Sequence, residues 1–304
     1  MREGPQGWQQ RVRKRAYEVT MIHLDADSVI EGIVQWCSRL RDIKDDAAFE
    51  IAWTETWAWI TDPLRAATLN ALLDGNEHPG MCELLPPFQR RWLAIKERKE
   101  AEHLISSRWG ANAVARDRVR AGFGRLTYDR VRELFDLVEL GSCRKFVMVG
   151  CGAFPAAILL VRDLTSVPDL IALDVEFEAA TMAQRVVDAI GDHRIHVHRI
   201  DGADYSYVGA DVIYIANHVC SKARSIERVR DSAPQDAVVI VREPYGVGRL
   251  VAETVVSHLP SPYRVAAIGA NHGTFYSRHV RLARIEAPVL LSTPQPQSDI
   301  GKLR

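Results

Sequence analysis

The stretch KFVMVGCGAFP, residues 145–155, joins a short run rich in β-branched residues to two closely spaced glycines. The run 145–149 predicts a buried strand, and the apolar run 156–161 predicts a helix directly after the turn. Gly150 and Gly152 can adopt positive φ angles and let another molecule approach the backbone closely. A helix that begins after such a turn presents free N–H groups and the positive end of its dipole. This strand–turn–helix unit is typical of nucleotide-like ligand sites in α/β sheets.

A second apolar run supports the same interpretation. Residues 170–173 form this run and end at Asp174, at about the twenty-residue spacing that dinucleotide sites show. A carboxylate at the end of a second strand is placed to accept hydrogen bonds from both ribose hydroxyls. The turn departs from the full dinucleotide fingerprint, which has a third glycine where this chain has Pro155. The two signals together predict a nucleoside-containing ligand at this edge of the sheet.

The composition is that of a globular protein with enough residues for one large domain or two modest ones. The chain has 304 residues, 47% of them hydrophobic, and its 39 acidic and 39 basic side chains cancel. A nucleic-acid partner held by a broad basic field is therefore not expected. No apolar run reaches the ~18 residues of a membrane-spanning helix, and residues 1–5 contain no apolar secretion core. We expect a cytoplasmic protein with a small-molecule substrate, and the sequence leaves monomer and homodimer open.

The five cysteines lie far apart in the sequence and form no Cys-x-x-Cys pair. Neither a zinc site nor a thioredoxin motif is indicated, so we expect reduced thiols and no metal. Cys151 differs from the others because it lies inside the glycine turn.

The part of the chain before residue 140 is predicted to be helical throughout. All seven tryptophans lie in this part. Tryptophans usually fill a core, and the alternative is that one or two line the roof of a pocket, where an aromatic face attracts a cation. Apolar spacing and breaker residues predict helices at 29–40, 46–60, 63–73, 88–108 and 128–140.

From residue 145 onward, predicted strands and helices alternate. This alternation indicates a doubly wound, mainly parallel, seven-stranded Rossmann-like sheet, with its last two strands forming an antiparallel hairpin at an edge. The expected domains are a helical cap at 1–122 and a ligand-binding domain at 123–287, followed by a flexible tail at 288–304. The strands are predicted at 145–149, 170–173, 195–199, 211–216, 237–241, 264–268 and 279–285, and the helices at 155–163, 178–190, 221–231 and 247–258.

Two further segments extend the ligand pattern. The run IDGAD, residues 200–204, follows the third strand, and either Asp201 or Asp204 could bind an adenine amino group. The fourth strand ends in Asn217 and His218, which could line the site, although a histidine there is equally often a packed, hydrogen-bonded residue. The glycine turn, the ribose acid, the adenine acid and the polar strand end together resemble class I S-adenosylmethionine-dependent methyltransferases over residues 140–285. The resemblance implies S-adenosylmethionine as ligand, bound by Gly150, Cys151, Gly152, Pro155, Asp174, Val175, Asp201, Gly202, Asn217 and His218.

Several motifs are more particular to one branch of that superfamily. The Gly-x-Gly-x-x-Pro turn, the run DVE at 174–176 and the run VREPYG at 241–246 resemble nicotianamine synthases. The run EAEHL at 100–104 and the stretch 123–128 are similar to segments that this family carries ahead of the fold. The resemblance implies that Glu102 binds or deprotonates the reacting amine and that Tyr128 contacts the substrate carboxylate or the sulfonium. The family's RSAHG motif is REPYG here and its tyrosine-rich stretch keeps one tyrosine, and these departures concern the acceptor substrate more than the cofactor.

The chemistry that the resemblance implies is not methylation. Enzymes of this family attack the carbon of the aminocarboxypropyl arm and expel methylthioadenosine. A smaller relative, bacterial azetidine-2-carboxylate synthase, only closes the ring, with S-adenosylmethionine as its sole substrate. The size of the chain and its tryptophan-rich cap favour ring closure. Aminocarboxypropyl transfer to a second amine, methyl transfer to a small molecule, and a non-catalytic ligand-binding role stay open as alternatives.

Overall fold

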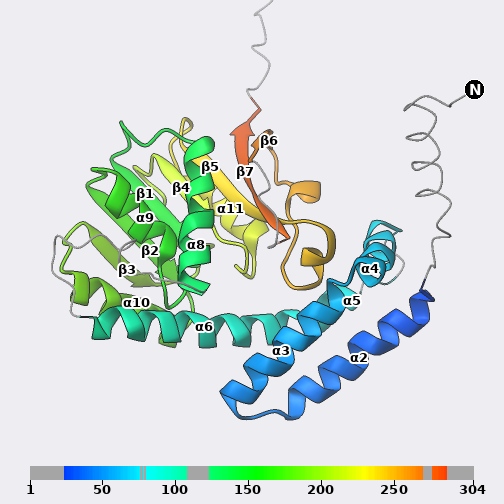
Figure 1. The fold of residues 1–304 in the computed structure, drawn as a ribbon. Helices are drawn as coiled ribbons and strands as arrows, with labels where there is room; N and C mark the ends of the chain where they lie inside the picture. Colours follow the sequence, from blue (N-terminus) through cyan, green and yellow to red (C-terminus); the bar gives the residue numbers. More distant parts are fainter. Residues whose placement is uncertain (1–23, 76–77, 79, 108–122, 270–275, 286–304) are drawn as a thin grey trace, which may run out of the picture.

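The computed structural model describes residues 24–75, 78, 80–107, 123–269 and 276–285, which form a group of helices beside an α/β sheet (Figure 1). Within these residues every strand follows residue 144, as predicted. The segments 1–23, 108–122 and 286–304, which include Trp8, Trp109 and the predicted tail, lie outside the described residues. The first helices are α2 (Ala26–Asp42), α3 (Asp46–Ile60), α4 (Pro63–Gly75), α5 (Met81–Leu84) and α6 (Pro86–Ser106).

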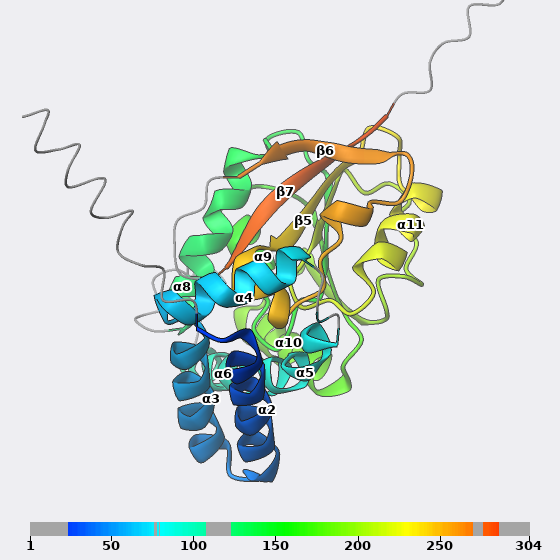
Figure 2. The same cartoon turned by 90° about the vertical axis from the view of Figure 1, so that its right-hand side faces the viewer.

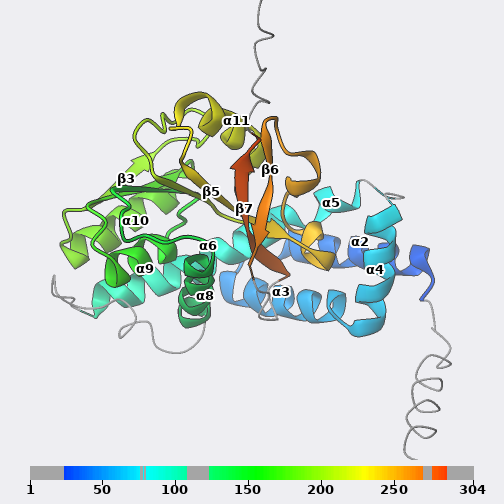
Figure 3. The same cartoon turned by 90° about the horizontal axis from the view of Figure 1, so that it is seen from above.

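The helical part is formed by local signals and by a shared core. The carboxylate of Asp25 accepts from the backbone N–H of Ser28 at 3.0 Å and caps α2, and Asp45 caps α3 in the same way. Helices α2 to α5 gather to one side of the sheet, and α6 extends from them along it (Figure 3). Helix α6 contacts both α3 and α10 (Phe177–Ile190). Its Ile95 packs in the helical core, while Ala101 and Leu104 pack in the core of the sheet.

The sheet has seven strands in the order β3-β2-β1-β4-β5-β7-β6. Neighbouring strands from β3 to β5 are parallel, and β7 is antiparallel to both of its neighbours, β5 and β6 (Figure 2). The fold class predicted from the sequence is confirmed, including the antiparallel pair at one edge. The strands are β1 (Lys145–Val149), β2 (Asp169–Asp174), β3 (Ile195–Arg199), β4 (Val212–Ile215), β5 (Val238–Pro244), β6 (Tyr263–Ile268) and β7 (Ser277–Arg284).

Both faces of the sheet are covered, so its central strands are apolar on both sides. Helices α8 (Phe123–Val131), α9 (Ala156–Leu164) and α10 pack on the face that carries Met148 and Tyr214. Helix α11 (Lys222–Ser232) packs on the other face, which carries Val149 and Ile215. Among the described helices, none is both long and apolar enough to cross a bilayer.

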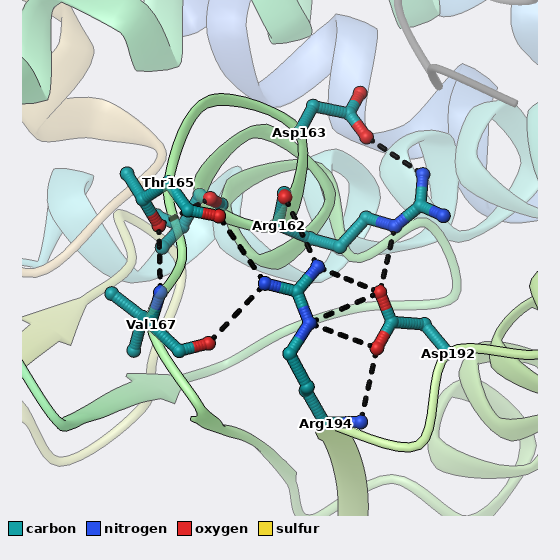
Figure 4. Close-up of polar contacts among 7 residues, drawn as sticks. Arg162, Asp163, Thr165, Val167, Asp192 and Arg194 are labelled. Carbon is teal, nitrogen blue, oxygen red and sulfur yellow. Dashed lines mark hydrogen bonds and ion pairs between the residues drawn. The ribbon is translucent and has the colours of Figure 1, made fainter. Parts of the chain in front are cut away.

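An ion-pair network ties the amino ends of β2 and β3 to α9 (Figure 4). Asp192 accepts from Arg162 Nε at 2.9 Å and from Arg194 Nη2 at 2.8 Å. These hydrogen bonds, mainly those from Arg194, hold the pKa of Asp192 well below its usual value. Arg194 also donates to the carbonyls of Arg162, Thr165 and Val167. The network lies at the opposite end of the strands from the glycine turn, so we assign it to the fold.

Two predicted helices are shorter than expected. The prediction of a helix at 247–258 is wrong, because this segment contains two 3₁₀ turns, η2 (Gly246–Leu250) and η3 (Val256–His258). Glycine disfavours helix, and Glu243 holds the backbone N–H of Val255 and Val256 at 3.1 and 3.2 Å in place of helical carbonyls. The helix predicted at 128–140 is divided into α8 and η1 (Arg132–Asp136).

Candidate functional site

The glycine turn is held against the end of β2. Gly150 and Gly152 have φ angles of 76° and 65°, which favour glycine. The N–H groups of Gly150 and Cys151 both donate to the carbonyl of Leu173 at 2.9 Å. Gly152 N donates to Asp174 Oδ2 at 2.8 Å. The predicted turn and the predicted ribose acid are therefore directly connected.

Asp174 is a buried carboxylate at the carboxyl end of β2, with only 9% of its surface exposed. Its second oxygen, Oδ1, accepts from Glu176 N at 3.0 Å. Burial raises the pKa of Asp174, and the hydrogen bonds from Gly152 and Glu176 oppose that shift. A carboxylate held in this way is fixed in position before a ligand arrives.

Glu97 on α6 is the acid that packs against the turn. Its Oε2 accepts from Ala153 N at 3.0 Å. Burial is the main cause that raises the pKa of Glu97, to about 8, and the nearby negative charge of Asp174 adds to the shift. A carboxyl group with a pKa close to working pH is suited to accept or donate a proton.

The prediction that Glu102 is the acid at this site needs correction. Glu102 is exposed and does not line the cavity described below, whereas Glu97 does. Five residues rotate a helix by about 140° beyond a full turn, so the two side chains leave α6 in different directions. The sequence does place Glu97 on the same predicted helix, five residues before Glu102. It lies within a run of charged residues, and such runs usually form a solvated helix face.

A cavity of about 1130 Å³ opens beside the turn. It is bounded by α3, α6, α8 and α10 together with the carboxyl ends of β1, β2, β4 and β5. The predicted residues that line it are Gly150, Cys151, Gly152, Asp174, Asn217 and His218, and three of the tryptophans, Trp53, Trp57 and Trp92, line it as well. Of the five tryptophans in the described residues, three line the cavity, where one or two were expected, and Trp53 also belongs to the helical core.

His218 and Cys151 line the cavity as neutral groups. Burial, together with the positive charges of Lys222, Arg242 and Arg130, lowers the pKa of His218 to about 3. Its Nε2 lies 3.2 Å from Nδ2 of Asn217. Burial raises the pKa of Cys151 well above its usual value, so this thiol is no ready nucleophile.

Several predicted residues lie near the cavity without lining it. Pro155 is the N-cap of α9, and Val175 is exposed. Asp201 Oδ1 accepts from Ala203 N at 2.9 Å, within the turn that also contains the buried Gly202. The adenine role of this turn stays a prediction. Tyr128 is on α8, and its side chain lies outside the described part of the structure.

A second set of polar side chains lies in and behind the wall of the cavity, and the sequence did not predict that they come together. Arg242 on β5 donates through Nη2 to Ser277 Oγ. Tyr214 Oη lies 3.2 Å from Nε2 of His279, and Nδ1 of His279 lies 3.7 Å from Glu133 Oε2. Burial lowers the pKa of His279 to about 4 and raises that of Tyr214, so both are neutral near pH 7. The group comes from β4, β5, β7 and η1, which only the folded sheet brings together.

We expect Gly152→Ala to destabilise the protein and to displace Glu97. A Cβ at this position would overlap the Glu97 carboxylate, and the φ angle of 65° adds backbone strain. Strain and overpacking together should cost about 2–4 kcal/mol. Gly209→Ala is the matched control, because Gly209 has a φ of 73° and open space around its Cβ position. Denaturant unfolding should show a clearly larger loss for Gly152→Ala, and equal losses would contradict the contact with Glu97.

Comparison with known proteins shows what the fold is similar to. No family model and no curated protein sequence matches the chain. Among solved structures, a mutant of the nicotianamine synthase MtNAS in complex with S-adenosylmethionine aligns with a TM-score of 0.68 at 16% identity, covering 84% of this chain and 97% of that one. MtNAS in complex with MTA and tNA aligns over the same shares with a TM-score of 0.69 and 16% identity. The chain therefore shares the fold of this nicotianamine synthase, a helical N-terminal region followed by a seven-stranded, methyltransferase-like sheet.

Proposed function

We propose that this protein is an S-adenosylmethionine-dependent enzyme that cyclises the aminocarboxypropyl arm to azetidine-2-carboxylate and releases methylthioadenosine. The observation that carries the proposal is Glu97, an acid with a pKa raised to about 8 that lies against a nucleoside-type glycine turn. Methyl transfer to an acceptor leaves the α-amine of S-adenosylmethionine unreacted, so that reaction requires no base for this amine. The fold shared with a nicotianamine synthase supports the same class of chemistry.

Binding of the nucleoside is assigned to the turn and to β2. Asp174 would accept hydrogen bonds from the ribose hydroxyls, and Gly150 and Gly152 let the ligand approach the backbone. Trp53, Trp57 and Trp92 supply aromatic faces in the same cavity. Such faces attract a sulfonium and exclude water that would otherwise attack the electrophilic carbon.

The ring closure is an internal displacement. The α-amine attacks the γ-carbon, the bond from that carbon to sulfur breaks, and its electron pair stays on the sulfur of methylthioadenosine. The amine must be unprotonated when it attacks, so the α-ammonium must first lose a proton, and the ring nitrogen of the product keeps its two hydrogens as an ammonium. Glu97 would take up this proton, for which its raised pKa is suited. A shaped cavity also supplies the bent geometry of the arm before the reaction.

A second candidate is aminocarboxypropyl transfer to a separate amine. The cavity volume of about 1130 Å³ favours it, because pockets for one small ligand usually measure roughly 300–1,000 Å³. Incubation with S-adenosylmethionine alone, followed by chromatography, tests the proposed function. Methylthioadenosine and azetidine-2-carboxylate formed together without an added acceptor support it. S-adenosylhomocysteine formed with an added acceptor would contradict it in favour of methyl transfer.

A further inference from the structure

The wall formed by α8, β5 and β7 contains two arginines. Arg130 and Arg242 both line the cavity. Burial lowers the pKa of Arg130, and the charge of Arg242 adds to that shift. Glu133 is the acid whose charge acts on both Arg130 and His279. His279 is neutral, so Arg130 and Arg242 are the cations that the described part of this wall presents to the cavity.

Arg242 is 92% buried, since only 8% of its surface is exposed. Its Nη2 donates to Ser277, but no group in the described part of the chain accepts from its Nε. Lys222 Nζ donates to the backbone carbonyl of Arg242 at 3.0 Å and helps to fix this end of β5. A buried cation without a complete set of acceptors is costly unless a ligand supplies them.

The chemistry of two guanidinium groups in one cavity wall points to one class of ligand. A guanidinium matches a carboxylate with two parallel hydrogen bonds, and a pair of arginines can bind both oxygens. The glycine-turn end of the cavity carries the acids Glu97 and Asp174 instead. A zwitterionic amino acid arm would therefore lie with its amine toward Glu97 and its carboxylate toward the arginines.

We propose that Arg130 and Arg242 form the binding site for the carboxylate of the aminocarboxypropyl arm. The assignment rests on the proposed function and names the part of the substrate that this wall recognises. By holding the carboxylate, the pair would orient the α-amine toward Glu97 and away from bulk water. Ser277 would act as a positioning residue, because its hydroxyl accepts from Arg242.

The test measures binding of three probes by calorimetry: S-adenosylmethionine, decarboxylated S-adenosylmethionine and methylthioadenosine. Arg242→Met should weaken S-adenosylmethionine roughly 10- to 150-fold, as expected for the loss of hydrogen bonds to a charged group. It should change the other two, which lack the carboxylate, by less than about threefold. Arg144→Met is the control, because this arginine has a side chain that is 83% exposed and lies outside the cavity.

Unchanged affinity for S-adenosylmethionine in Arg242→Met would overturn the assignment. The same result is expected if the arginines bind the carboxylate of a separate acceptor, and the assignment would be wrong in that case too. Equal losses for all three probes would overturn it as well, because Arg242 would then support the fold. Arg242→Lys keeps the charge and should recover only part of the affinity, since an ammonium lacks the fork geometry. Failure of the proposed function would be seen differently, in the products: wild-type protein that shows this pattern of affinities but forms S-adenosylhomocysteine with an acceptor would keep the carboxylate site and exclude ring closure.

Discussion

Glu97→Gln should reduce the rate of methylthioadenosine release at saturating S-adenosylmethionine by on the order of 10²- to 10⁴-fold. Glutamine has nearly the same shape, and its amide oxygen can still accept from Ala153 N. It cannot take up the proton that the reacting amine loses. Glu102→Gln is the matched control on the same helix, because Glu102 is exposed and does not line the cavity. Near wild-type turnover in Glu97→Gln would remove this residue from the mechanism.

The same substitution should change how stability depends on pH. The pKa of Glu97 is about 8 in the folded protein and near the ordinary value of 4.5 when unfolded. Between these values the folded state binds more protons, so the contribution of Glu97 to stability falls as pH rises from 4.5 to 8. Glutamine does not titrate. The melting temperature of Glu97→Gln relative to wild type should therefore rise between pH 5 and pH 8, and a constant difference would contradict the raised pKa.

Asp174→Ala should weaken S-adenosylmethionine binding roughly 30- to 1000-fold, which corresponds to about 2–4 kcal/mol for paired charge-assisted hydrogen bonds. The variant also releases Gly152 N, whose position the carboxylate fixes. Calorimetry measures the affinity, and circular dichroism checks that the sheet is intact.

Asp169→Ala at the opposite end of the same strand is the control for Asp174→Ala. Its affinity for S-adenosylmethionine should match that of wild type. Methylthioadenosine should lose affinity for Asp174→Ala to the same extent as S-adenosylmethionine, because both carry the ribose. An Asp174→Ala protein with wild-type affinity for either ligand would place the nucleoside elsewhere.

Much of the sheet could be predicted because its signals are local. The run 145–149 coincides with β1, and the six other strands differ from prediction by at most three residues at an end. Buried parallel strands are continuous apolar runs, and their ends coincide with polar or glycine residues. The 3₁₀ segment after β5 could not be predicted in this way, because Val247 and Leu250 are apolar in a helical pattern but pack in the helical core of the N-terminal part.

The site was harder to predict than the fold, because side chains from distant segments form it. The glycine turn and Asp174 lie in one continuous motif, and the structure joins them by a hydrogen bond. Glu97 lies in a charge run whose Lys96, Arg98 and Lys99 form ion pairs, and only the packing of α6 places Glu97 against the glycine turn. Arg130 on α8 and Arg242 on β5 line the same cavity, although no sequence spacing links the two segments.

The central claim is that the nitrogen of S-adenosylmethionine itself closes the ring. It is tested most directly with S-adenosylmethionine labelled with ¹⁵N at the α-amine, given to the protein as the only substrate and followed by mass spectrometry. We predict methylthioadenosine and singly ¹⁵N-labelled azetidine-2-carboxylate in equal amounts. Methylthioadenosine that forms only after a second amine is added, with the ¹⁵N in an open-chain product, would contradict ring closure.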